Sequence, residues 1–157
     1  MKISLLLTGK TDQNYLADGV SDFAKRIKAY VNFNIITIPA NKKHNTLPAE
    51  QRKEKEGELI IPYMQKSDFC VLLDERGKKL DSKAFAKFLQ ERMNRSTKSL
   101  LFIVGGPWGF SKEVYEKAHF KLSLSPMTFS HQLVRLIFME QLYRAFSIIN
   151  NQPYHND

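Results

Sequence analysis

The sequence predicts an α/β fold with a mostly parallel sheet flanked by helices. Short apolar runs typical of strands alternate along the chain with longer amphipathic patterns typical of helices. The apolar runs are unbroken, which is typical of strands covered by helices on both faces. A length of 157 residues is that of one domain, so residues 1–157 are predicted to fold as a single unit. In such sheets, ligands bind beyond the carboxyl ends of the strands.

The first part of the chain predicts two strands and two helices. Residues 2–8 form a short apolar run that ends in a glycine turn, as expected of a buried strand. Residues 14–31 place apolar side chains three and four positions apart, which predicts a helix. Residues 34–38 predict the second strand. Residues 41–46 are polar and basic and predict a mobile loop, after which Pro48 opens a helix that reaches about residue 65.

The rest of the chain continues the alternation. Residues 68–74 predict a strand buried on both faces, and Asp81 or Ser82 can cap the helix that follows. Residues 99–104 predict another buried strand. Residues 122–131 predict a short strand that gives way to a loop rich in hydroxyl groups.

The last helix is predicted over residues 131–150 and is apolar almost all round. Such a helix is buried on several sides, either in the core of one subunit or against a second subunit. For a chain this small, we favour an interface between two copies of the chain. The terminal residues 153–157 include Tyr154 and His155, which favours a functional tail.

The amino-acid composition limits the classes of partner and the cellular compartment that we expect. The chain has 24 lysine and arginine residues against 16 acidic residues, a net charge of +8. This excess favours an anionic partner, but solvated lysines on helix surfaces would produce it as well. The one cysteine, Cys70, is expected in the core; it excludes an internal disulfide and a cysteine zinc cluster and fits a reducing compartment. No apolar stretch reaches about 18 residues. We therefore expect a cytoplasmic protein that binds no membrane and no metal.

A glycine-rich loop follows the strand at 99–104. Residues 105–111 read Gly-Gly-Pro-Trp-Gly-Phe-Ser, and Ser111 can cap a helix that begins at Lys112. The loop matches neither the dinucleotide nor the nucleotide-phosphate fingerprint. Its glycines either let backbone approach a ligand or only allow a turn, and Trp108 is either a stacking residue or a cover for the sheet.

Several segments together resemble the bacterial RlmH family. They are Phe-Ile-Val-Gly-Gly-Pro-Trp-Gly at 102–109, Leu-Ser-Pro-Met-Thr-Phe-Ser-His-Gln-Leu-Val-Arg at 124–135, Glu-Gln-Leu-Tyr-Arg-Ala-Phe-Ser-Ile at 140–148 and Pro-Tyr-His at 153–155. The resemblance covers the whole chain. It implies a SPOUT methyltransferase that uses S-adenosylmethionine to methylate N3 of a pseudouridine in 23S ribosomal RNA of the assembled ribosome. It also implies a homodimer and a trefoil knot in the C-terminal part, whereas the residue pattern alone predicts an open doubly wound sheet.

The resemblance also implies which residues bind the cofactor. They are Leu73, Gly105, Gly106, Leu124, Ser125, Pro126, Met127, Thr128 and Phe129.

Candidates for a base or for a cation that stabilises the acceptor are chosen by residue type. They are His131, Arg135, Arg144, Tyr154 and His155. Arg144, Tyr154 and His155 are the first choices for binding the target across the dimer, since an aromatic face can stack an extruded base. Two other classes stay open: a non-catalytic ribosome-binding or RNA-binding protein, and an α/β enzyme that acts on a small molecule.

Overall fold

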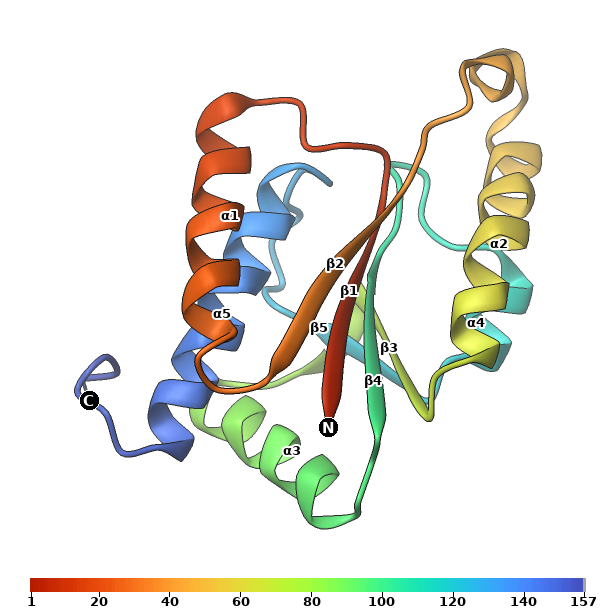
Figure 1. The fold of residues 1–157 in the computed structure, drawn as a ribbon. Coiled ribbons are helices and arrows are strands. Elements are labelled where there is room, and N and C mark those ends of the chain that lie inside the picture. The colour runs from red at the N-terminus through yellow and green to blue at the C-terminus, as the bar shows by residue number, and fades with distance from the viewer. Residues whose placement is uncertain (157) are drawn as a thin grey trace.

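The computed structural model describes residues 1–156 and contains one five-stranded sheet in which all paired strands run parallel (Figure 1). The strand order is β2-β1-β4-β3-β5. The strands are β1 (Lys2–Thr8), β2 (Asn32–Ile38), β3 (Phe69–Lys79), β4 (Ser99–Val104) and β5 (Phe120–Ser123). The predicted α/β fold with a parallel sheet is therefore confirmed. Asp157, the end of the predicted tail, lies outside the described residues.

Helices cover both faces of this sheet, and Figure 1 shows α1, α3 and α5 on one face and α2 and α4 on the other. The helices are α1 (Asn14–Ile27), the 3-10 helix η1 (Lys42–Thr46), α2 (Ala49–Gln65), α3 (Ser82–Asn94), α4 (Lys112–Lys117) and α5 (Leu133–Ile149). Within the described chain no helix combines the length and the apolar character that a membrane span requires.

Side chains of successive strand residues enter two separate cores, because neighbouring residues of a strand point to opposite faces. Leu5 and Leu7 of β1 belong to the core beneath α1, α3 and α5, whereas Leu6 belongs to the core beneath α2 and α4. Cys70 is fully buried in the second core, as expected of a small core residue. Burial on both faces explains why the strands appear in the sequence as unbroken apolar runs.

The segment at 41–46 differs from its prediction as a loop. Lys42–Thr46 forms a short 3-10 helix, which Asn41 begins by accepting a hydrogen bond from the backbone N–H of Lys43 at 3.0 Å. Asparagine side chains often replace backbone acceptors in this way. The basic residues of the segment are thus held at the start of α2.

The strand β3 is also longer than its prediction, because it continues beyond Asp74 to Lys79. Its pairing with β5 is interrupted: Leu73 pairs with Leu122, and the next registered partner of Leu122 is Lys78. The four residues between them, 74–77, bulge out of the ladder. Bulges of this kind redirect side chains and are frequent beside functional sites.

Candidate active site

A cavity of about 260 Å³ lies at the carboxyl ends of β4 and β5, beside the bulge in the middle of β3. It is lined by Leu73, by residues 74–76 of the β3 bulge, by the glycine loop and by the loop after β5. Eight of the nine residues implied for cofactor binding line this cavity; they are Leu73, Gly105, Gly106, Leu124, Ser125, Met127, Thr128 and Phe129. Pro126 does not line it. The structure thus brings together residues that are 56 positions apart in the sequence, from Leu73 to Phe129.

The loop after β5 is shaped by its hydroxyl groups. Ser123 Oγ donates to the carbonyl of Ser125 at 2.9 Å, and Ser125 Oγ accepts from the N–H of Met127 at 3.0 Å. Within the described residues, the backbone N–H groups of Thr128 and Phe129 donate no hydrogen bond. Such N–H groups, beside the apolar Leu73 and Leu124, can hold a ligand with a flat ring and polar edges.

The bulge of β3 gives the cavity an acidic rim. Thr128 Oγ1 donates to Glu75, and the Tyr115 hydroxyl donates to Asp74. Burial, followed by the hydrogen bond and charge of Asp74, raises the pKa of Tyr115 to about 12, so the phenol stays protonated and keeps donating. Within residues 1–156, no group of three or more His, Cys, Asp or Glu side chains is placed to hold a metal ion.

The glycine loop is fixed from behind by Glu56 of α2. Glu56 Oε1 accepts from the backbone N–H of Gly106 at 2.9 Å. Burial raises the pKa of Glu56, and the Gly106 hydrogen bond and the Arg52 charge only partly oppose this shift. A Cβ at Gly106 would lie 2.7 Å from Glu56 Oε2, and one at Gly105 would lie 2.9 Å from the ring of Phe110. Both glycines are therefore needed for close packing.

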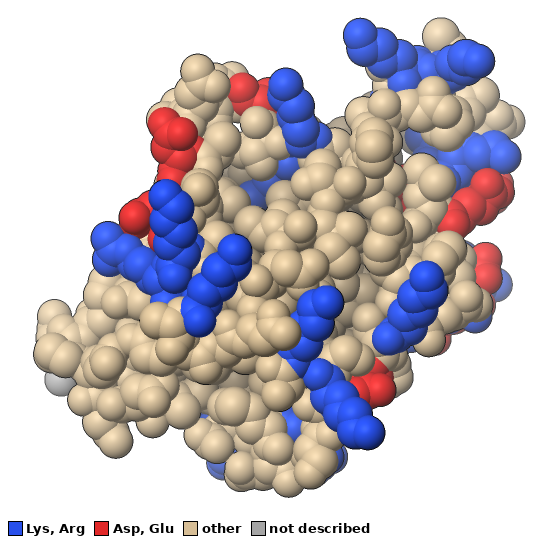
Figure 2. All heavy atoms as spheres, viewed as in Figure 1, with Lys and Arg blue, Asp and Glu red and all other residues tan. Residues whose placement is uncertain are grey.

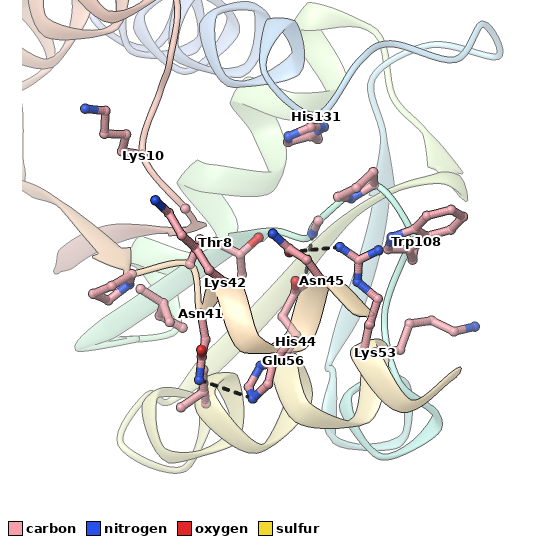
Figure 3. A pocket seen from close by; sticks show the side chains of 18 of the residues that line it. Thr8, Lys10, Asn41, Lys42, His44, Asn45, Lys53, Glu56, Trp108 and His131 are labelled. Atoms are coloured by element: carbon pink, nitrogen blue, oxygen red, sulfur yellow. Dashed lines mark hydrogen bonds between the residues drawn. The ribbon is translucent and has the colours of Figure 1, made fainter. Parts of the chain in front are cut away.

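A second and larger cavity of about 800 Å³ lies on the other side of the glycine loop, and we call it the basic cleft. Figure 3 shows this cleft with Lys10 on the left, Trp108 on the right, Lys42 and Asn45 between them, and His131 above. Its walls come from the ends of β1 and β2, from η1 and from the first turns of α2. Residues 106–109 and His131 line both cavities, so the cleft and the smaller cavity are neighbours.

Two of the candidate residues lie at the start of α5 and differ in role. Burial and the charge of Arg135 lower the pKa of His131, which keeps the imidazole neutral near pH 7. Arg135 itself is fully buried. Its guanidinium donates to the carbonyls of Thr8 and Gly9 at 2.9 Å each and to Thr11 Oγ1 at 3.0 Å. It thereby fixes the turn after β1 and lines neither cavity.

The other three candidates form a cluster at the far end of α5. The Arg144 guanidinium forms an ion pair with Glu140, and its central carbon lies 4.7 Å from the ring centre of Tyr154. The Tyr154 hydroxyl donates to Glu140 at 3.1 Å, and Arg144 Nη1 lies 3.4 Å from His155 Nδ1. Arg144 is ten residues beyond Val134, which lines the small cavity, or about 15 Å along the helix. Within one chain, the Arg144 cluster therefore does not reach the small cavity.

Sequence reasoning missed the bulge and the contribution of Glu56. Asp74, Glu75 and Arg76 look like an ordinary polar loop after a strand, and the pairing with β5 is visible only in three dimensions. Glu56 stands among alternating lysines and glutamates at 53–58, a pattern typical of a solvated helix face. Gly57 directly after it was a signal of close packing, since a glycine inside a helix indicates a close neighbour.

Comparison with known proteins defines the class. A family model described as "Predicted SPOUT methyltransferase" matches residues 1–155, and the chain belongs to this family. The fold is that of a solved structure titled as a probable methyltransferase from Bordetella pertussis, with a TM-score of 0.55 over 92% of this chain and 96% of that chain at 11% identity. The protein is therefore an enzyme of the methyltransferase class, and its chemistry needs a methyl donor.

Within this class, full-length relatives point to one group. A protein of Christiangramia forsetii is 51% identical over 99% of both chains, and one of Parabacteroides distasonis is 48% identical over the whole of both. Both are named "Ribosomal RNA large subunit methyltransferase H". The resemblance to the RlmH family is thus confirmed.

Proposed function

We propose that this protein transfers a methyl group from S-adenosylmethionine to N3 of a pseudouridine in 23S ribosomal RNA, acting on the assembled ribosome in the cytoplasm. The observation that carries the proposal is a cavity with an acidic rim that shares a wall with the basic cleft. A cationic donor and a polyanionic acceptor can be held side by side in this way. The names of the relatives support the choice of ribosomal RNA.

The small cavity fits the cofactor by its donor set. Leu73, Leu124 and Phe129 offer apolar surface for a purine, and the N–H groups of residues 128 and 129 can meet its polar edge. Carboxylates at 74 and 75 can face a sulfonium and an ammonium group. When bound, the cofactor supplies a methyl group already activated for transfer, so the protein mainly has to align the reacting atoms and exclude water.

The acceptor nitrogen needs to lose its proton as the methyl group arrives. His131 lines both cavities and its lowered pKa keeps it neutral, so its imidazole can accept the N3 proton at neutral pH. Arg135 does not compete for this role because its guanidinium is buried against the turn after β1.

A homodimer would complete the site. The Arg144, Tyr154 and His155 cluster lies too far along α5 to reach the small cavity of its own chain. A second subunit can supply the cluster, with Arg144 as a cation for the developing charge on the base and Tyr154 as a stacking surface. Apolar residues of α5 that stay partly exposed, such as Leu136 and Ile137, support such an interface. The trefoil knot stays a prediction from the family.

Methyl transfer to ribosomes tests the proposal directly. Ribosomes from a strain that lacks the protein would be incubated with methyl-labelled S-adenosylmethionine, and the labelled nucleotide would then be mapped. We expect label at N3 of one pseudouridine in 23S RNA. Cofactor binding without label on ribosomes or free RNA would refute the substrate, and absence of cofactor binding would favour a non-catalytic ribosome-binding protein.

A further inference from the structure

The basic cleft is larger than the small cavity and is lined by more cationic side chains. Its volume is about 800 Å³, against about 260 Å³ for the small cavity. Most of its lining comes from elements that the small cavity does not use, namely the ends of β1 and β2, η1 and the start of α2. It therefore offers room for a ligand other than the cofactor.

The sign of the charge differs between the two cavities. The small cavity is lined by two acidic residues, Asp74 and Glu75. Among its described lining residues the one cationic side chain is Arg76, because the lowered pKa of His131 keeps that imidazole neutral. The cleft is lined by four cationic side chains and two carboxylates, Asp12 and Glu56. The cationic ones are Lys10, Lys42, Arg52 and Lys53.

The carboxylates of the cleft leave much of this positive charge free. Glu56 is directed to the backbone of Gly106, and burial raises its pKa. Lys53 pairs with Glu50 at 2.8 Å, but no ion pair is recorded for Lys10 or Lys42 within the described part of the chain. Lys10 and Lys42 are exposed. Figure 2 shows lysine and arginine side chains gathered at the upper right, over η1 and the start of α2.

An aromatic side chain stands at the wall shared by the two cavities. Trp108 is 53% exposed, and the guanidinium carbon of Arg52 lies 5.5 Å from its ring centre. Arg52 also donates to Asn45 at 3.1 Å, which holds the guanidinium in place. A fixed arginine behind an exposed indole forms a flat stacking surface, the kind of surface on which unpaired bases rest.

We propose that the basic cleft binds a single-stranded segment of the RNA substrate directly beside the target nucleotide. Trp108 stacks one flanking base, and Lys10 and Lys42 contact the phosphates next to it. This inference rests on the proposed function and adds to it the path of the RNA strand. Because residues 106–109 and His131 separate the cleft from the small cavity, a strand in the cleft places its next nucleotide at the methyl donor.

Salt dependence of ribosome binding tests the phosphate contacts. The probe is ribosomes from a strain that lacks the protein, and the variant is Lys10→Ala with Lys42→Ala. For a single strand, each lost phosphate contact makes the negative slope of log affinity against log salt shallower by about 0.7. We therefore expect the slope of the double variant to be shallower by about 1.4. The matched control is Lys66→Ala with Lys87→Ala, which removes the same charge from exposed positions outside both cavities. A slope equal to that of the control would overturn the proposal.

Substitution of Trp108 tests the stacking surface. We expect Trp108→Ala to weaken ribosome binding about 10-fold or more and Trp108→Phe to restore most of it, since any aromatic face stacks a base. Equal binding by the alanine variant and the original protein would contradict the stacking role. Hydroxyl-radical footprints of the ribosomal RNA identify the partner: we expect the lysine variant to lose protection beside the target, whereas an unchanged footprint despite weaker binding would mean a ribosomal protein instead.

The same proteins separate this inference from the proposed function. Cofactor affinity and methyl transfer are measured for the original protein and for each variant. If the original protein transfers no methyl group, the proposed function fails. If it does and the cleft variants bind and react as the control does, only the cleft assignment fails.

Discussion

Gly77, the glycine of the β3 bulge, has no room for a side chain. A Cβ at this position would lie 2.6 Å from both the carbonyl carbon and the carbonyl oxygen of Lys121. Ordinary carbon contacts begin near about 3.5 Å, so Gly77→Ala requires β5 to move by about 1 Å. Backbone cannot rotate away as a side-chain tip can. We expect a loss of about 1–3 kcal/mol in the free energy of unfolding, or a melting temperature lower by about 2–12 °C.

The displacement also reaches the small cavity, because β5 leads directly into the loop that lines it. We therefore expect Gly77→Ala to weaken S-adenosylmethionine binding about 10-fold, measured by titration calorimetry beside a thermal melt. Gly19→Ala is the matched control: its Cβ would lie 2.8 Å from Leu136 Cδ1, the tip of a side chain that can rotate, and alanine favours the helix α1 by up to about 1 kcal/mol. If both variants melt and bind like the original protein, the bulge is not held by this contact.

The further predictions concern three titratable groups. Because the folded pKa of Glu56 is raised, its contribution to stability is complete below pH 4.5 and is lost as the pH rises, so Glu56→Gln should gain stability over the original protein toward pH 8 in thermal melts. Glu56→Ala leaves the N–H of Gly106 without its acceptor and should be about 1–3 kcal/mol less stable than Glu56→Gln; equal melts would contradict this. The pKa of His131 is lowered, so its contribution is present above pH 6.5 and lost as the pH falls; His131→Asn should reduce the acid sensitivity of the melting temperature. Burial raises the pKa of the Cys70 thiol to about 11 from 9.0, so alkylation of the native protein should be about 100-fold slower than that of free cysteine on thiolate content alone, and rapid alkylation would show that the core opens.

The hydrophobic pattern predicted the order of the buried strands and the main helices, because burial of the strands on two faces imposes unbroken apolar runs. Leu5, Leu6 and Leu7 are all buried although they point into different cores, so the run at the start of the chain carries no alternation. The rule that ligands lie beyond the carboxyl ends of parallel strands pointed to the segments after Asp74 and Val104, which the structure shows as the β3 bulge and the glycine loop. The specific cofactor residues came from the family resemblance, and the structure shows that most of them line one cavity.

Contacts between residues far apart in the sequence could not be predicted from the hydrophobic pattern. Arg135 is a charged residue, and charged residues are mostly found at the surface of a protein. It is instead fully buried, which is possible only because carbonyls of Thr8 and Gly9, more than 120 residues away, accept its hydrogen bonds. The bulge at 74–77 is hidden for the same reason, since its shape depends on where β5 pairs.

The glycine loop explains how two cavities of opposite charge can be neighbours. Side chains at 105 and 106 would collide with Phe110 and Glu56, so this part of the loop has to be glycine. Glu56 holds the loop by one hydrogen bond, and its raised pKa shows that it is held there at a desolvation cost. Under the proposed function, the acidic bulge would favour the cationic donor in the small cavity and the basic cleft would favour the anionic RNA, so donor and acceptor would meet at the residues that line both cavities.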